Sequence, residues 1–292
     1  MYQINGYYEA SSIKDAIDHL AANENSQIIA GGTDVLIKTR EHKGGYTDRD
    51  LIGIMRIPEI RGICQDDDGN IYIGAATSFT EVEENELIRK HIPSLCTAVG
   101  SVGGPQIRNM GTIGGNVANG ATSADSASTL FAIDAVICIE GPEGKREVPI
   151  ADFYQGPGKV DLKRGELLTC LKIMKKDFEG YKGHYIKFSQ RKAMDIATLG
   201  CSILIKETDG VVEDLRIAFG VAGPTPVRAV EAEAYARGRK LTDEILDEIG
   251  MKCLENASAR DSWRASKAFR EQLIRELPKR AIKIALGGNG HA

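Results

Sequence analysis

Two glycine-rich segments contain the residues best suited to hold a ligand. The longer runs from Gly100 to Asp125 and has seven glycines in its first 21 residues, whereas the whole chain has 32 in 292. The shorter, Gly31–Asp34, reads Gly-Gly-Thr-Asp and directly follows the apolar run 27–30. Because glycine costs backbone entropy, folded proteins keep it where the chain turns sharply or must approach another group closely. Consecutive N–H groups in such turns can converge on an anion.

The chemistry that these segments offer is binding rather than catalysis. One glycine pair is usually a simple turn, but two pairs, each attached to an apolar strand, favour a shared anionic ligand such as a diphosphate. The sequence contains neither GxxxxGK[ST] nor GxGxxG, which excludes the two commonest phosphate-binding motifs. It also has no GxSxG, no HExxH and no clustered histidines. A bound cofactor would therefore carry any reaction.

The cysteines and the overall charge exclude other classes of site and partner. The six cysteines are scattered without a CxxC pair, which argues against an iron–sulfur or zinc site in this chain; they are Cys64, Cys96, Cys138, Cys170, Cys201 and Cys253. We interpret them as buried, reduced thiols of a cytoplasmic protein. A net charge of −4 does not favour a nucleic-acid partner. No run approaches the ~18 apolar residues of a membrane span, and the N-terminus does not resemble a signal peptide.

The elements that must position the two glycine segments alternate between strands and helices. Apolar spacing after Ser12 predicts a helix over 13–21. A strand over 27–30 leads into the first glycine pair, the apolar pattern resumes at 35–37, and the polar residues 38–50 indicate a loop. Further expected elements are strands at 51–55 and 166–173, hairpins at 63–73 and 135–150, and helices after Ser78, from Pro93 to Val99 and over 123–131.

A charged segment without periodicity, 175–182, is the best domain boundary. Beyond it the pattern predicts three strands, at 185–191, 199–207 and 211–222, followed by helices at 228–238, 243–256 and 266–286. Pro278 lies inside the last helix, where a kink or break is expected.

Several motifs resemble the FAD-binding subunit of the molybdenum hydroxylases, and most closely that of bacterial xanthine dehydrogenases. They are AGGTD at 30–34, TIGGN at 112–116, Asp125, GPGK at 156–159 and RKAMDI at 191–196. The likeness implies an α+β fold, in which a two-part α/β FAD-binding domain of PCMH type, like that of vanillyl-alcohol oxidase, is followed by a small antiparallel sheet plus helices. The implied domains are 1–176, with subdomains of about 1–55 and 56–176, and a C-terminal domain of CO-dehydrogenase flavoprotein type at 182–288.

The resemblance also implies a function. FAD in this chain would receive electrons from [2Fe–2S] clusters in a small partner subunit and pass them to NAD⁺. A large molybdopterin-binding partner would oxidise xanthine to urate. The cofactor-binding residues carried over from the family are Gln27, Ile28, Ile29, Ala30, Gly31, Gly32, Thr33, Asp34, Asn109, Gly111, Thr112, Ile113, Gly114, Gly115, Asn116, Asp125, Leu168, Lys187 and Ile196. Asp125 would bind ribose or ribityl hydroxyls, and Lys187 would reach the polar edge of the flavin.

Other readings stay open at this stage. The complex could act on another purine, another N-heterocycle or CO, and the chain could be a stand-alone FAD oxidase or a non-catalytic nucleotide-binding module. Val102 stands where animal relatives have an aromatic ring that stacks on adenine. The segment around Trp263 is either a loop that caps a helix or an interface with another subunit.

Overall fold

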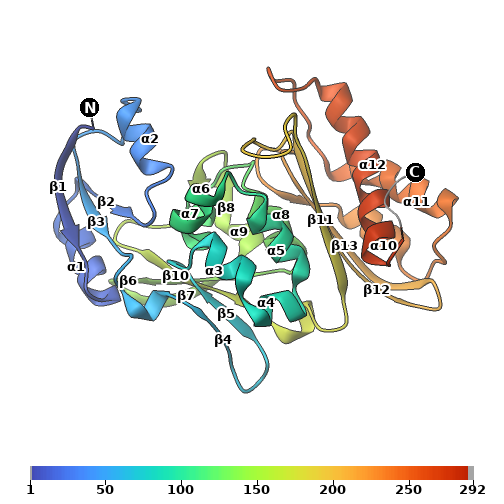
Figure 1. The fold of residues 1–292 in the computed structure, drawn as a ribbon, viewed down its shortest axis with the longest axis horizontal. Helices are drawn as coiled ribbons and strands as arrows, with labels where there is room; N and C mark the ends of the chain where they lie inside the picture. The colour runs from blue at the N-terminus through green and yellow to red at the C-terminus, as the bar shows by residue number, and fades with distance from the viewer. Residues whose placement is uncertain (1, 289–292) are drawn as a thin grey trace.

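The computed structural model describes residues 2–288, and three parts of the chain follow one another along its longest axis (Figure 1). The N-terminal part is a parallel sheet of three strands in the order β1-β3-β2. Its elements are β1 (Ile4–Glu9), α1 (Ile13–Ala22), β2 (Ser26–Ile29), α2 (Val35–Arg40) and β3 (Arg49–Gly53). Strand β1 was not predicted, and residues 38–40 belong to helix α2 rather than to a loop.

The middle part is built on an antiparallel sheet of five strands in the order β4-β5-β10-β6-β7. Its strands are β4 (Ile63–Gln65), β5 (Ile71–Gly74), β6 (Val136–Gly141), β7 (Gly144–Pro149) and β10 (Leu167–Ile173), and a small pair is formed by β8 (Tyr154–Gly156) and β9 (Lys159–Val160). Its helices are α3 (Phe79–Glu84), α4 (Glu86–His91), α5 (Pro93–Gly100), α6 (Pro105–Met110), α7 (Ile113–Ala118), α8 (Asp125–Ala132) and α9 (Ile150–Phe153).

The glycine-rich segment is more helical than its sequence suggests. It contains both α6 and α7, which begin after Gly104 and Thr112. The expected helix after Ser78 is confirmed, because the Ser78 side chain accepts from the Glu81 N–H while the Glu81 carboxylate accepts from the Ser78 N–H. This capping box fixes the start of α3 beside the glycine segment.

The C-terminal part is an antiparallel sheet of four strands in the order β11-β12-β13-β14, packed against helices (Figure 1). Its elements are β11 (Lys182–Phe188), β12 (Leu199–Thr208), β13 (Val211–Gly220), β14 (Val227–Arg228), α10 (Val230–Ala236), α11 (Asp243–Lys252) and α12 (Lys267–Ala285). Along the described chain, short 3₁₀ turns lie at Pro58–Ile60 before β4, at Lys175–Asp177 after β10 and at Cys253–Asn256 after α11. The expected break at Pro278 is absent, because α12 continues through it with Leu277, Ala281 and Ile282 buried in the core.

Each part has its own apolar core, and this arrangement confirms the α+β fold class. Ile52, Ile57 and Ile60 belong to the N-terminal core, Leu95 and Leu130 to the middle core, and a third cluster lies under the C-terminal sheet. The reading of the cysteines as buried is wrong for Cys64, which is exposed, and for Cys96, Cys138 and Cys170, which are half-buried. The apolar runs around them are strands and helices with one face turned toward solvent, so sequence context alone overestimates their burial.

Candidate functional site

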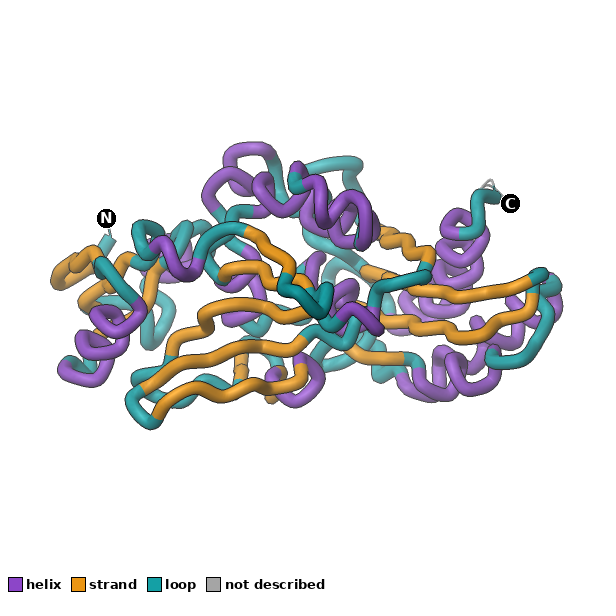
Figure 2. The backbone as a smooth tube through the Cα atoms, turned by 90° about the horizontal axis from the view of Figure 1, so that it is seen from below, coloured by secondary structure: helices purple, strands orange, loops and turns teal. Residues whose placement is uncertain are grey.

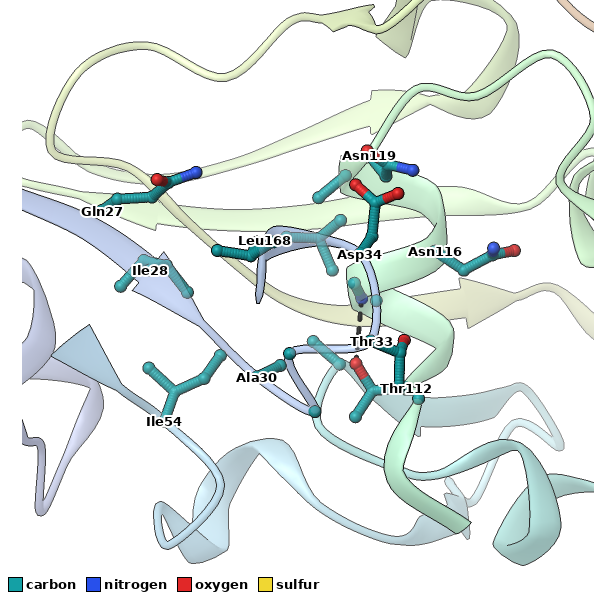
Figure 3. A pocket seen from close by; sticks show the side chains of 18 of the residues that line it. Gln27, Ile28, Ala30, Thr33, Asp34, Ile54, Thr112, Asn116, Asn119 and Leu168 are labelled. Carbon is teal, nitrogen blue, oxygen red and sulfur yellow. Dashed lines mark hydrogen bonds between the residues drawn. The ribbon is translucent and has the colours of Figure 1, made fainter. Parts of the chain in front are cut away.

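The two glycine-rich segments meet at one cavity of about 260 Å³. It lies where the loop after β2 crosses in front of helix α7, as Figure 3 shows. Predicted residues that line it are Gln27, Ile28, Ala30, Gly31, Gly32, Thr33, Asp34, Gly111, Thr112, Gly114, Gly115, Asn116 and Leu168. Segments that are about 80 residues apart in the sequence thus form opposite walls of one cavity.

Close backbone contact explains two of the glycines. A Cβ atom on Gly31 would lie only 1.6 Å from the Met110 carbonyl oxygen, and one on Gly114 would lie 2.5 Å from the Cβ of Ala75. Gly32 has a φ of +71°, which L-residues with side chains rarely adopt. Glycine therefore lets the first loop touch the second segment, and lets α7 lie directly on the end of β5.

The first loop supplies unused hydrogen-bond donors. Within residues 2–288, the backbone N–H groups of Gly31, Gly32, Thr33 and Asp34 donate to no protein acceptor. Asp34 precedes helix α2 without capping it through its side chain. Such orphan donors need a partner, and next to a helix N-terminus the preferred partner is an anion.

The N–H groups that follow Thr112 in the second segment already have protein acceptors. Thr112 caps α7, and its Oγ1 accepts from the Gly115 N–H at 3.1 Å. The N–H groups of Ile113 and Gly114 donate to the carbonyls of Thr77 and Ala75, each at 3.0 Å. The expectation of a turn with converging bare peptides is therefore wrong here, because the residues after Thr112 form the first turn of a helix.

Lys38 is the main cavity residue that the sequence analysis missed. Its ammonium contacts Asp34 at 2.5 Å, the Asn119 side-chain oxygen at 2.6 Å and the Tyr46 hydroxyl at 3.2 Å. Burial favours the neutral amine, but the bonds to Asp34 and Tyr46 outweigh it and raise the pKa of Lys38. The Asp34–Lys38 spacing of four residues is the helical signal that would have revealed it.

Two further polar side chains, those of Gln27 and Glu166, line the cavity. The Gln27 side-chain oxygen is buried and has no hydrogen-bond partner among the described residues. Glu166 also lines the cavity, and its carboxylate binds Arg146 at 2.7 and 2.8 Å. That contact lowers the pKa of Glu166. Val102 lines the cavity as well.

Six predicted residues lie outside the lining of the cavity: Ile29, Asn109, Ile113, Asp125, Lys187 and Ile196. Ile29 and Ile113 are buried behind it, and Ile196 is 47% exposed on the loop after β11. Asn109 accepts a hydrogen bond from the Thr80 hydroxyl at 2.6 Å. Their proposed contacts with a cofactor stay predictions.

Asp125 and Lys187 bind each other. The Lys187 ammonium donates to Asp125 at 2.8 Å and to the Ser101 carbonyl at 2.9 Å, while the Tyr185 hydroxyl donates to the other Asp125 oxygen at 2.8 Å. Burial raises the pKa of the Asp125 carboxyl, and Lys187 opposes that rise. These bonds join α8 to β11. They also reach Ser101, the residue before Val102 in the cavity wall.

The cavity suits a ligand that combines a diphosphate with hydrogen-bonding ring edges. Orphan N–H groups match phosphate oxygens, the Lys38 ammonium adds a positive charge near them, and the unpaired Gln27 oxygen matches an N–H donor. Its volume lies just below the ~300–1,000 Å³ of small-molecule pockets, so a dinucleotide would extend beyond it along the open side.

The described residues include no group of three or more His, Cys, Asp or Glu side chains placed to hold a metal ion. None of the helices in residues 2–288 combines the length and the apolar character that crossing a bilayer requires.

Comparisons with known proteins agree with this geometry. Residues 2–174 match the family model described as FAD binding domain in molybdopterin dehydrogenase, and residues 184–285 match the CO dehydrogenase flavoprotein C-terminal domain. The chain is 42% identical to the xanthine dehydrogenase FAD-binding subunit of Escherichia coli O157:H7 over 99% of both chains. It is 30% identical to the glyceraldehyde dehydrogenase medium chain of Sulfolobus acidocaldarius, over 95% of this chain and 96% of that one.

The fold is also similar to solved structures. Carbon monoxide dehydrogenase from Hydrogenophaga pseudoflava, in a form that lacks the Mo-pyranopterin moiety of its cofactor, matches with a TM-score of 0.92. The match covers 98% of this chain and 99% of that chain at 28% identity.

Proposed function

Because the chain belongs to the FAD-binding medium subunits of the molybdenum hydroxylase family, we propose that it serves a xanthine dehydrogenase with NAD⁺ as the electron acceptor. The observation that carries the proposal is the 42% identity to a xanthine dehydrogenase FAD-binding subunit over 99% of both chains. Relatives named for other substrates, such as the glyceraldehyde dehydrogenase medium chain at 30%, are less similar. The molybdenum and iron–sulfur centres would be held by a large and a small partner subunit.

The residues of this chain would hold FAD in three ways. The free N–H groups of Gly31–Asp34 would donate to the diphosphate, and Lys38 would add a positive charge beside it. Gln27 would accept a hydrogen bond at the cavity's buried end, and Leu168 would pack against a ring. Bound FAD supplies the capacity to accept and release electrons singly or in pairs.

The Asp125–Lys187 pair would contact FAD next to Val102, because Lys187 binds the carbonyl of the preceding residue, Ser101. Lysine has three N–H donors, and Lys187 uses two of them on Asp125 and the Ser101 carbonyl. Its remaining donor would face the polar edge of the flavin. Asp125 would then hold the Lys187 ammonium in place. The alternative that the family implies is a direct bond from Asp125 to hydroxyl groups of the cofactor.

A second candidate is the flavin subunit of a related hydroxylase with another substrate. It is favoured by the 30% identity to the glyceraldehyde dehydrogenase medium chain over 95% of this chain. The substrate pocket would lie on a partner chain in either case, so this cavity does not distinguish the two.

The test uses the assembled complex. Co-expression with a molybdopterin-binding chain and an iron–sulfur chain from the same organism should yield a complex that forms NADH from NAD⁺ when xanthine is added. Glyceraldehyde and nicotinate serve as competing substrates, and an artificial dye serves as a competing acceptor. Faster oxidation of a competitor would overturn the substrate proposal. Reduction of the dye without reduction of NAD⁺ would overturn the proposal that NAD⁺ is the electron acceptor.

A further inference from the structure

Two cysteines that the cofactor site does not use face each other on adjacent strands. Cys138 of β6 and Cys170 of β10 are directly opposite in the antiparallel ladder. Directly opposite residues have Cα atoms about 4.5–5.5 Å apart and side chains on the same face. Disulfides form at Cα separations of about 4.4–6.8 Å, so this pair could close without moving either strand.

The pair lies on the open face of the five-stranded sheet. Along β10, Leu171 and Ile173 point into the middle core, whereas Cys170 and Lys172 are half-buried on the other side. Helices α6, α7 and α8 are drawn above strands β6, β7 and β10 in Figure 1, and the view from below shows the strands of this sheet (Figure 2). Both cysteines are only half-buried, so small solutes can reach them.

The two thiols are chemically unequal. Interaction between the two thiols lowers the pKa of Cys170 and raises that of Cys138. On the same face, Lys172 contacts Glu147 at 3.1 Å, and Glu147 lies directly opposite Cys138. Burial and the Glu147 carboxylate oppose a thiolate at Cys170, and the Lys172 ammonium favours it, so the contact with Cys138 decides which thiol ionises first.

We propose that Cys138 and Cys170 are a redox-active dithiol that hydroperoxides convert to a disulfide. The Cys170 thiolate attacks the peroxide, the O–O bond breaks, and a sulfenic acid forms while the leaving alkoxide or hydroxide takes up a proton. The Cys138 sulfur then attacks the Cys170 sulfur, the S–O bond breaks, and water leaves with the Cys138 proton. Each disulfide consumes one hydroperoxide and yields one alcohol or water and one further water.

Closure would tie the cavity wall to its neighbouring strand. Cys170 lies two residues after Leu168, which lines the cavity, and a ladder irregularity falls between them. A cross-link at this point restricts the unfolded chain and so raises the melting temperature of the oxidised form.

The test is titration of the purified full-length chain with hydrogen peroxide, followed by alkylation, non-reducing digestion and mass spectrometry. We expect a cross-linked peptide that joins Cys138 to Cys170, two fewer free thiols per chain, and reversal by dithiothreitol. Exposed Cys64 is the internal control. Oxidation of Cys64 without the cross-link, or together with it at the same peroxide dose, would overturn the proposal.

Single variants separate the two roles. In Cys138→Ala, the sulfenic acid at Cys170 has no resolving thiol and should be trapped by dimedone. In Cys170→Ala, dimedone labelling at Cys138 should be at least severalfold lower. Cys64→Ser should cross-link at the wild-type rate. Equal labelling of the two single variants would contradict the assigned order of attack, and the wild-type digest decides the matter if a variant misfolds.

Discussion

Replacement of Gly31 by alanine tests the contact between the two glycine segments. The new Cβ would lie 1.6 Å from the Met110 carbonyl oxygen, whereas ordinary contacts begin at 3.4 Å. The loops must therefore separate by about 1.8 Å, several times the ~0.5 Å tolerance of a binding site. Overpacking of this kind costs about 1–3 kcal/mol of stability.

The larger effect is expected on FAD affinity. A shift of this size would remove at least two charge-assisted hydrogen bonds from the 31–34 loop, each worth about 1.5–3 kcal/mol. A loss of about 3 kcal/mol or more corresponds to an increase in Kd of ~100-fold or more. Titration of the reconstituted apo-chain, followed by quenching of flavin fluorescence, measures this directly.

Two other glycines provide matched controls. A Cβ on Gly44 would meet no atom within 4 Å, so Gly44→Ala should bind FAD like the wild type. A Cβ on Gly115 would meet only the Thr112 hydroxyl closely, at 2.9 Å, and the side chain can give way. Gly115→Ala should therefore have an intermediate effect. A folded Gly31→Ala protein with a Kd within threefold of the wild type would refute the reasoning.

Two further predictions concern charged residues of the cavity. Lys38→Met removes the cation and leaves the Asp34 carboxylate facing the phosphates, so the Kd for FAD should rise ~10-fold or more. Adding Asp34→Asn to this variant should restore part of the affinity in the same titration. If it restores none, the loss of affinity has another cause than the unpaired Asp34 carboxylate. Because Arg146 lowers the folded-state pKa of Glu166, this carboxylate stabilises the fold above its unfolded pKa of ~4.5, and that contribution is lost as the pH falls through the folded value. Urea unfolding from pH 7 to 3 should thus show a shallower acid loss in Glu166→Gln than in the wild type, and parallel curves would contradict the assignment.

Much of the fold was predictable because its signals are local. The Ser78–Glu81 spacing gave the start of α3, and the nearly continuous apolar run at the start of 199–207 gave β12. Strand β1 was missed because its residues are mostly exposed and show no apolar alternation. Pro278 does not break α12, since burial of the residues around it outweighs one lost backbone bond, whereas the alternative of a kink stays a prediction.

The location of the cavity was predictable from the sequence, but which of its two segments supplies free hydrogen-bond donors was not. Two glycine pairs marked the cavity walls, yet no sequence pattern reveals that Thr77 and Ala75 occupy the donors of the second segment. The pairing of Asp125 with Lys187 is equally invisible, because the two residues come from α8 and β11 and meet only through tertiary packing. Contacts of this range depend on the arrangement of elements rather than on spacing.

The position of the cavity links cofactor binding to the integrity of the fold. Its donor loop follows β2 and is anchored on the N-terminal core, whereas α7 belongs to the middle core. Gly31 lets these walls touch through backbone atoms. A diphosphate that binds the free donors would add the missing interactions across this boundary. Because a ligand that binds only the folded state stabilises it by mass action, FAD bound to these donors would act as part of the junction between two cores.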